Sequence, residues 1–448
     1  MTAPRPVVVV VGGGMAGLAA AYALREVADV LVLEASGRVG GKLQISDVGG
    51  IPVDEGADAM LRRVPYAVQL AAEIGLDLIS PAAGQAYVRS RGALRPLPTG
   101  TVLGVPADLA ALARSEVLSA AGLARVPLDL VRPGEPVTED VSVGSYVAAR
   151  LGREVVERLV DPLLGGVYAG RADRLSLQAT LPALAGQLVQ HRSLLLAARA
   201  SRGTPAPGPV FAGLRGGLGT FPPALARASG ADVRTGTTVR ALERTGTGWR
   251  LVTGSAASPS YVDADAVVLA VPAAPAARLL AAHVPVDDLA GIDYASVAIV
   301  TLVLDGPPPG RGSGYLVPAV EGLTTKAVTF TSRKWDLDRT VVRASVGRYG
   351  EQVELQREDD ELVALVLEEL ERVVGPVGAL ADSRVTRWGG GLPQYAVGHL
   401  GRVRRIKASL PAGIAVAGAA YDGVGVPAVV RSGQEAARRV ENGLHDSP

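Results

Sequence analysis

A run of valines from Val7 to Val11 leads directly into the turn Gly12-Gly13-Gly14-Met15-Ala16-Gly17. Such an uninterrupted β-branched run is typical of a parallel strand that is buried on both faces. Gly12, Gly14 and Gly17 have the G-x-G-x-x-G spacing: the first permits a tight turn, the second lets a diphosphate approach the backbone, and the third packs the next helix on the strand. The N–H groups and dipole at that helix N-terminus can bind a diphosphate without a lysine. The sequence therefore predicts a dinucleotide-binding unit here.

A second buried strand, residues 29–33, ends on Glu34. An acid at this position can accept hydrogen bonds from both hydroxyls of an adenosine ribose. The segment from Ala35 to Lys42 then places Arg38 and the pair Gly40-Gly41 close behind the acid. A nicotinamide enzyme has no particular need for this segment. A protein that buries a whole FAD can use Arg38 on the diphosphate and the two glycines where backbone passes close to the cofactor. The alternative is a glycine-rich turn with a surface glutamate.

These residues resemble the FAD-dependent amine oxidase superfamily, in which a glutamate is followed by an Arg-x-Gly-Gly element. A buried strand after Gly413, a glycine loop over 418–426 and a closing helix around 432–437 are similar to the segment that this superfamily places along the flavin. The resemblance implies one FAD per chain, held non-covalently because there is no cysteine, and no histidine near these motifs, for a covalent link. The implied cofactor-binding residues are Gly12, Gly13, Gly14, Met15, Ala16, Gly17, Glu34, Ala35, Arg38, Gly40, Gly41, Lys42, Val239, Gly418, Tyr421, Val424, Gly425 and Val426.

Composition excludes several other kinds of chemistry. The 448 residues are 48% hydrophobic and 20% charged, with a formal net charge of +1, which fits a packed protein of two or three domains and gives no sign of a nucleic-acid partner. Without cysteine there are no disulfides, thiolate nucleophiles or iron–sulfur clusters. The histidines are scattered, so no metal site is predicted. No apolar segment suits a signal peptide or a membrane span, and we expect a cytoplasmic monomer or homodimer.

The elements assigned to the cofactor are spread along the chain, with other segments between them. The Pro- and Gly-rich stretch from Arg202 to Pro209 reads as a linker, and residues 359–374 have the pattern of a long amphipathic helix. We therefore expect an α/β fold with a discontinuous Rossmann-like FAD-binding domain of the GR2 type and inserted substrate-binding and helical domains. The expected boundaries are 1–75, 208–280 and 383–448 for the FAD-binding domain, 76–104 and 290–382 for the mixed-sheet α+β substrate domain, and 105–207 for the helical domain.

The inserted segments resemble the porphyrinogen oxidases within this superfamily. The elements that carry the resemblance, in chain order, are Leu97-Pro98-Thr99-Gly100, Gly166-Val167-Tyr168-Ala169-Gly170 with Leu175-Ser176, residues 214–218 (LRGGL), Thr331-Ser332-Arg333-Lys334-Trp335, residues 392–399 (LPQYAVGH) and residues 417–426. The resemblance implies oxidation of a cyclic tetrapyrrole with sp3 meso carbons in three two-electron steps, with O2 as acceptor and H2O2 as product. The protein would hold a meso carbon at about 3–3.5 Å from the flavin N5, and the gain in aromaticity leaves little need for a catalytic acid or base.

Two porphyrinogens of heme biosynthesis are candidate substrates: coproporphyrinogen III, with four propionates, and protoporphyrinogen IX, with two. We expect the first, because the chain shows no membrane span and the bacterial enzymes that it resembles are mostly of the coproporphyrin type. A flat, apolar ring with carboxylates at its edge needs an apolar slot with cations at the rim. The residues implied near the substrate are Gly166, Val167, Ala169, Gly170 and Leu316, with Arg62 or Arg63 on a carboxylate.

Several assignments stay open at this point. Lys326 can bind a propionate, lie near the flavin N5 through a water, or be a strand-edge charge. Tyr421 can form an aromatic wall or simply pack, and we expect His399 to be structural rather than a base. An amine oxidase, a carotene desaturase and a non-catalytic FAD- or tetrapyrrole-binding protein remain alternatives. The aromatic content of 4% disfavours an amine oxidase with a flavin face lined by aromatic pairs.

Overall fold

The valine run forms the central strand of a parallel sheet. The computed structural model describes residues 5–134, 137–203 and 208–445. In it, β1 (Val7–Val11) lies between β2 (Asp29–Leu33) and β16 (Ala266–Leu269), and β12 (Asp232–Arg234) and β22 (Ile414–Val416) are the outer strands. All four pairings are parallel. Strands from three distant parts of the sequence therefore build one sheet.

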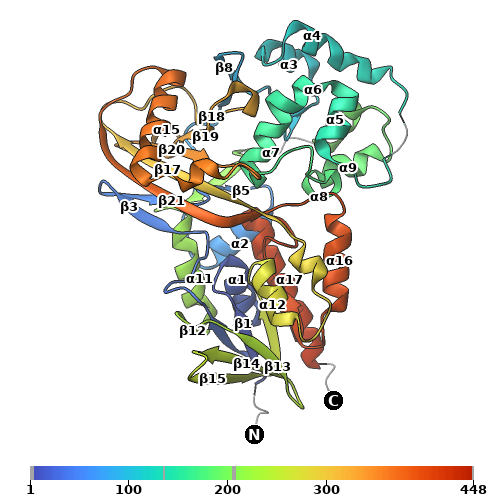
Figure 1. Ribbon diagram of the computed structural model, residues 1–448, viewed down its shortest axis with the longest axis vertical. Helices are drawn as coiled ribbons and strands as arrows, with labels where there is room; N and C mark the ends of the chain where they lie inside the picture. Colours follow the sequence, from blue (N-terminus) through green and yellow to red (C-terminus); the bar gives the residue numbers. More distant parts are fainter. Residues whose placement is uncertain (1–4, 135–136, 204–207, 446–448) are drawn as a thin grey trace.

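Both faces of this sheet are covered, which explains its continuous apolar strands. Val8 and Val10 pack on the face covered by α1 (Met15–Leu24) and α17 (Val426–His445). Val9 and Val11 pack on the opposite face, against β14 (Trp249–Gly254), α12 (Ala273–Leu280) and α16 (His399–Ser409). Figure 1 shows α1 and α17, from opposite ends of the chain, side by side in this lower part of the molecule.

A second sheet is mixed and has the strand order β21-β17-β20-β19-β18-β7-β8. Only the β18–β7 pairing is parallel. One face packs on the amphipathic helix α15 (Asp359–Val374), whose bounds are those expected from the sequence. The strands are β7 (Ala86–Ser90), β8 (Ala93–Pro96), β17 (Tyr294–Leu304), β18 (Gly314–Leu316), β19 (Thr325–Phe330), β20 (Thr340–Val346) and β21 (Leu380–Pro393).

The segment after residue 106 is helical, as expected, and forms its own apolar cluster beside the second sheet (Figure 1). Its helices are α3 (Leu109–Ser115), α4 (Ala120–Arg125), η1 (Val126–Leu130), α5 (Val143–Leu151), α6 (Arg153–Val155), the π-helix η2 (Val156–Val160), α7 (Asp161–Tyr168), α8 (Leu177–Thr180), α9 (Pro182–Leu188) and α10 (Leu194–Ser201). The expected linker lies partly outside the described residues, at 204–207.

Short elements connect these layers. They are β3 (Ile45–Val48), β4 (Ile51–Asp54), β5 (Met60–Leu61), α2 (Pro65–Glu73), β6 (Leu78–Ile79), β9 (Thr101–Val102), β10 (Val105–Pro106), β11 (Phe211–Leu214), η3 (Leu218–Thr220), α11 (Phe221–Ser229), β13 (Ala241–Arg244), β15 (Pro259–Ala264), α13 (Asp287–Ala290), η4 (Ala319–Glu321), α14 (Thr331–Trp335) and η5 (Val353–Gln356).

The structure differs from the expected boundaries at two places. The closing helix α17 begins at Val426, several residues before Ser432, because Pro427 suits the first turn of a helix. The boundary expected at residue 383 falls inside β21, which continues to pair with β17 up to Pro393. Across the described part of the chain, no helix combines the length and the apolar character needed to cross a membrane.

Candidate cofactor and substrate site

The glycines of the first turn divide into two kinds. At Gly12, where φ is +107°, a Cβ would lie 2.6 Å from the carbonyl oxygen of Ala270; at Gly17 it would lie 1.9 Å from that of Gly12. These two glycines are therefore required by contacts within the protein. Gly14 is different, because a Cβ there would meet nothing within 4 Å. Gly14 is the N-cap of α1 and has φ −75°, which any residue can adopt.

Other glycines surround the same open space. The backbone of Gly14 forms a bridge with Gly40, and the nearest atom to a Cβ on Gly41 would be the Gly14 Cα at 3.5 Å. On the C-terminal side, a Cβ on Gly418 would come no closer than 3.9 Å to the Ala16 Cβ, and one on Gly425 would have similar room. Bare backbone from three segments thus borders a space that protein side chains do not fill, beside the N-termini of α1 and α17. A dinucleotide diphosphate fits the chemistry of this cradle.

Glu34 connects the end of β2 to this turn. Its Oε2 accepts the N–H of Gly13 at 2.7 Å, and its Oε1 accepts the N–H and the hydroxyl of Ser36 at 2.8 and 2.7 Å. Arg38 donates to the carbonyl oxygens of Val39 and Gly41, so it lies against the second glycine element. Ala35 is exposed.

Lys42 is exposed, yet enough protein surrounds it that desolvation lowers the pKa of its ammonium group. A side chain that faces into a recess is both exposed to solvent and partly desolvated by the surrounding protein. The side chains of Met15 and Ala16, by contrast, are buried in the protein core. A contact of these two residues with a cofactor would therefore be made by their backbone.

The remaining expected cofactor residues face different surroundings. Val424 packs on the helical cluster, and Val426 belongs to the same buried cluster as Leu18 and Ala19 of α1. Tyr421 is only 2% exposed and packs in the cluster below the parallel sheet, where burial raises the pKa of its hydroxyl. Its surroundings are those of a packing residue rather than of an aromatic wall. Val239 packs at the border of that cluster.

Gln394 and Tyr395 join the helical region to the C-terminal loop. The Gln394 amide donates to the carbonyl oxygen of Tyr168 at 2.8 Å. The Tyr395 hydroxyl donates to the Ala419 carbonyl at 2.6 Å and accepts the Gly423 N–H at 2.7 Å. The elements 166–170, 392–399 and 417–426, which are far apart in the sequence, are therefore one connected structure.

His399 stacks on Tyr395, with ring centroids 4.0 Å apart. It is 2% exposed, and burial, together with the charge of Arg402, lowers its pKa to about 4. A ring that stays neutral and enclosed at physiological pH has a packing role, as the sequence analysis expected.

The expected substrate residues separate into an exposed and a buried group. Gly166 and Val167 at the end of α7 are exposed, and a Cβ on Gly166 would lie 3.7 Å from the Leu316 side chain. Ala169, at φ +48°, is fully buried among Ala295 and Val297. A Cβ on Gly170 would lie 2.4 Å from the Gln394 side-chain oxygen. Ala169 and Gly170 therefore face protein, whereas Gly166 and Val167 are accessible, and Gly166 lies beside the half-buried Leu316.

Lys326 does not lie at a strand edge, because β19 runs between β18 and β20. Its side chain is 6% exposed and makes no hydrogen bond or ion pair with any residue that the structure describes. Burial, with a smaller effect of the Arg348 charge, lowers its pKa to about 7. Arg348 is also buried and donates to the carbonyl oxygen of Val317, next to Leu316. Arg62 and Arg63 are both exposed, and Arg62 is 3.3 Å from the Ser80 hydroxyl.

Asp58, Lys334 and Arg343 form a charged cluster that the sequence did not predict. The Asp58 carboxylate accepts from Lys334 Nζ at 2.9 and 3.0 Å and lies 3.6 Å from Arg343. Burial alone would raise the pKa of Asp58, but the two cations outweigh it and hold the pKa below its usual value. Lys334 belongs to the element Thr331–Trp335, one of those that resemble the porphyrinogen oxidases. The role of Asp58 and Lys334 in joining the second sheet to the first domain depends on a long-range contact. Within the described ranges, no group of His, Asp and Glu side chains could hold a metal ion.

The parallel sheet, the two helix N-termini and the bare glycine cradle are features that suit a flavin-binding oxidoreductase. A model of the flavin-containing amine oxidoreductase family matches residues 15–441, and the chain belongs to this family.

Individual relatives are similar over nearly their whole length. Coproporphyrinogen III oxidase from Mycobacterium leprae (strain TN) is 40% identical over 94% of this chain and 95% of its own. The protein of the same name from Bacillus subtilis (strain 168) is 32% identical over 96% of both chains. A crystal structure of a protein from Exiguobacterium sp. 255-15, provisionally named a protoporphyrinogen oxidase, superimposes with a TM-score of 0.87 at 32% identity and 99% coverage of both chains. The α/β fold expected from the sequence is therefore the fold of this family.

Proposed function

We propose that this chain is an FAD-dependent oxidase that converts coproporphyrinogen III to coproporphyrin III in three two-electron oxidations. The observation that carries this proposal is the similarity to coproporphyrinogen III oxidases of Mycobacterium leprae and Bacillus subtilis, at 40% and 32% identity. Because it extends over nearly the whole of both chains, it includes the inserted segments as well as the cofactor-binding ones. A match limited to the glycine turns would have supported a cofactor and nothing about the substrate.

One FAD per chain, held without a covalent bond, fits the cradle of Gly14, Gly41, Gly418 and Gly425, into whose open space the diphosphate can approach bare backbone. When bound, FAD supplies two-electron acceptor chemistry, with O2 as the final acceptor and H2O2 as the product. The Glu34 carboxylate has lone pairs left for ribose hydroxyls after it has bound Gly13 and Ser36.

The substrate contacts follow from the exposed group of residues. Gly166, Val167 and Leu316 offer an apolar surface for one face of a flat macrocycle, and the bare Gly166 lets the ring approach the helix. Lys326, buried and without an anion, is suited to a propionate. Arg62 or Arg63 would take a carboxylate at the rim. The chain is assigned no catalytic acid or base: its contribution is to hold a meso carbon in place and to exclude water.

Protoporphyrinogen IX is the second candidate substrate, supported by the name given to the Exiguobacterium protein. Exposed carboxylate–cation pairs contribute only about 0–1 kcal/mol each. We therefore expect the preference for coproporphyrinogen III to be modest, on the order of tenfold in kcat/KM.

An aerobic assay of the purified, FAD-loaded protein tests this proposal. Coproporphyrinogen III, protoporphyrinogen IX, a series of amines and a carotenoid are supplied in turn, and porphyrin fluorescence and peroxide are recorded. We expect coproporphyrin III with three peroxides per ring. A higher kcat/KM for protoporphyrinogen IX would make it the assigned substrate in place of coproporphyrinogen III. Tetrapyrrole binding without peroxide formation would indicate a carrier. Turnover of amines alone would contradict the proposal.

A further inference from the structure

Asp422 lies in the loop between β22 and α17, and its carboxylate is held from two helices. Its Oδ1 accepts from Lys407 Nζ of α16 at 2.7 Å, and its Oδ2 accepts from the Ser432 hydroxyl of α17 at 2.6 Å. Ser432 Oγ in turn accepts the Gly418 N–H at 2.9 Å. Lys407, Asp422, Ser432 and Gly418 thus form one hydrogen-bonded chain, called the Asp422 relay below.

The direction of each hydrogen bond in the relay is fixed by chemistry. A hydroxyl has a single proton, and an ionised carboxylate can only accept, so Ser432 donates to Asp422. Its lone pairs are then left to face the Gly418 amide. Ser432 is 1% exposed, so water does not compete for this geometry. The charge on Asp422 therefore decides how the Ser432 hydroxyl holds Gly418.

Gly418 is fixed on both sides of its Cα. Its N–H is bound by Ser432, and its carbonyl oxygen accepts the Tyr421 N–H at 3.1 Å. The Gly418 N–H is therefore not available to a cofactor, whereas the Cα faces the open space of the cradle. The relay therefore sets how close a cofactor can come to this backbone, and it does so without touching the cofactor.

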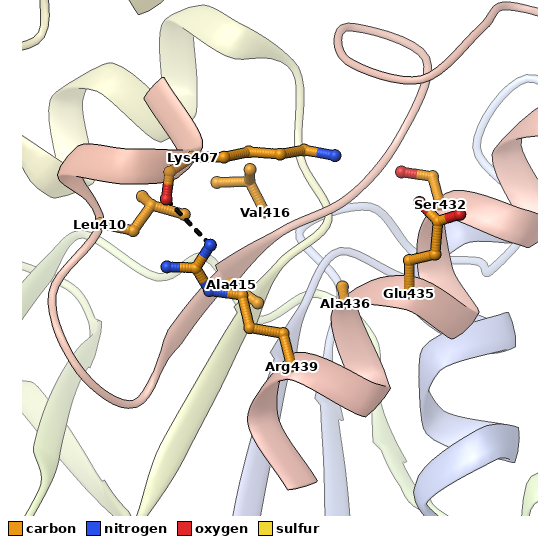
Figure 2. A pocket seen from close by; sticks show the side chains of 8 residues that line it. All are labelled: Lys407, Leu410, Ala415, Val416, Ser432, Glu435, Ala436 and Arg439. Carbon is orange, nitrogen blue, oxygen red and sulfur yellow. Dashed lines mark hydrogen bonds between the residues drawn. The ribbon is translucent and has the colours of Figure 1, made fainter. Parts of the chain in front are cut away.

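Lys407 and Ser432 approach each other from opposite sides of a small cavity of about 50 Å³ beside β22. Figure 2 shows the ammonium end of Lys407 extended toward Ser432. Glu435 and Arg439 line the cavity from α17, the helix that also carries Ser432. Arg439 donates to the Lys407 carbonyl oxygen at 2.9 Å and holds the end of α16 in place. Glu435 pairs instead with Arg431 at 3.6 Å and stands outside the relay.

We propose that Asp422, oriented by Lys407, is a positioning residue for the cofactor and fixes the loop from Gly418 to Val426 through Ser432. This inference rests on the FAD-binding part of the proposed function and is independent of the substrate. Tyr395 holds the same loop at Ala419 and Gly423. The relay holds the adjacent residues Gly418 and Asp422 from the side of α16 and α17.

The test is an FAD titration of apoprotein, monitored by flavin fluorescence, with Tm recorded for every variant. We expect Asp422→Asn and Ser432→Ala each to raise the Kd for FAD tenfold or more. Because the two act as one unit, the double variant should bind no more weakly than the weaker single variant. Lys407→Met should weaken FAD binding, whereas Lys407→Arg should restore it to near the wild-type value. Glu435→Gln, on the same cavity wall, is the matched control and should match wild type.

The outcomes separate this inference from the proposed function. One outcome is that the wild-type protein binds FAD and the relay variants bind it with the same Kd but have a lower Tm. The relay would then only support the fold. Additive effects in the double variant would overturn the idea of one unit. Lys407 is 32% exposed, so its variants remain informative if replacement of the buried Ser432 prevents folding. Wild-type protein with no affinity for FAD would overturn the cofactor assignment itself.

Discussion

The carboxylate of Glu34 accepts the amide proton of Gly13 at 2.7 Å, so the acid that ends β2 closes over the glycine turn that follows β1. Its second oxygen is bound by Ser36. The acid therefore shapes the turn independently of any contact with a ribose. One residue then carries two roles, and they can be measured separately.

Replacement of Glu34 by Ala should lower the thermal stability of the apoprotein and its affinity for FAD. Loss of charge-assisted hydrogen bonds to the ribose is expected to cost about 1.5–3 kcal/mol of FAD affinity. The Gly13 and Ser36 amides also lose their acceptor, so the Tm of the apoprotein should fall. Thermal unfolding and flavin occupancy are measured on the same samples, with Ser36→Ala as the control that keeps the acid. Unchanged flavin occupancy in Glu34→Ala would rule out the ribose role.

The two kinds of glycine predict opposite phenotypes for the same substitution. Gly14→Ala should fold normally, because its Cβ has open space, but its methyl group should obstruct the diphosphate and reduce FAD binding. Gly17→Ala should fail at the level of the fold, because its Cβ would lie 1.9 Å from the Gly12 carbonyl oxygen. Circular dichroism and FAD titration distinguish the two. Normal FAD affinity in Gly14→Ala would show that the diphosphate lies elsewhere.

Local sterics explain which features the sequence could predict. The helix over Asp359–Val374 was predicted with its correct bounds, since acids in its first turn and Gly375 after its last residue mark both ends locally. The role of Gly17 also follows from spacing, because a Cβ there would meet the Gly12 carbonyl oxygen of the same turn. The closest contact of Gly12, by contrast, is with Ala270, which is distant in the sequence.

Features that depend on distant partners could not be predicted. Lys334 binds Asp58 from 276 residues away, and Gln394 binds Tyr168 across 226 residues. The motif around Val167–Gly170 indicated a substrate wall, but which of its residues are exposed depends on how the end of α7 packs against β17 and β21. Gly166 and Val167 face outward there, while Ala169 and Gly170 face Val297 and Gln394.

That packing predicts that Gly166, in α7, borders the substrate, whereas Gly170, just after α7, does not. Gly166→Leu should keep the fold and FAD affinity, because its side chain points into accessible space beside Leu316, but it should strongly reduce porphyrinogen turnover. Gly170→Ala is the contrasting variant: its Cβ would collide with Gln394 and loosen the Tyr395 contacts, so Tm and flavin occupancy should fall together. Steady-state kinetics and Tm are compared. Wild-type turnover in Gly166→Leu would move the slot away from α7.

The buried His399 should make the protein acid-sensitive. Burial lowers its folded pKa to about 4, below the ordinary value of 6.5. As pH falls from about 6.5 to about 4, the unfolded chain takes up a proton that the folded chain does not, and stability is lost. His399→Phe keeps the stack on Tyr395 without this group. The difference in unfolding free energy between the two proteins should therefore change between pH 6.5 and 4 and stay constant above pH 7.5. A constant difference throughout would mean that His399 titrates normally.

Lys326 should also make stability rise with pH, as His399 does but in a higher pH range, and it should have an effect on substrate choice. Burial lowers its folded pKa to about 7, so the cost of enclosing an ammonium group is fully present below pH 7. Between about pH 7 and 10.5 the folded chain loses this proton while the unfolded chain keeps it, and the cost declines. Lys326→Met should therefore raise Tm clearly at pH 6 and little at pH 10. If Lys326 binds a propionate, the same variant should raise KM for coproporphyrinogen III more than for protoporphyrinogen IX, and mainly below pH 7, where the lysine is charged. A Tm gain with KM unchanged for both substrates would leave Lys326 as a buried charge without a role in binding.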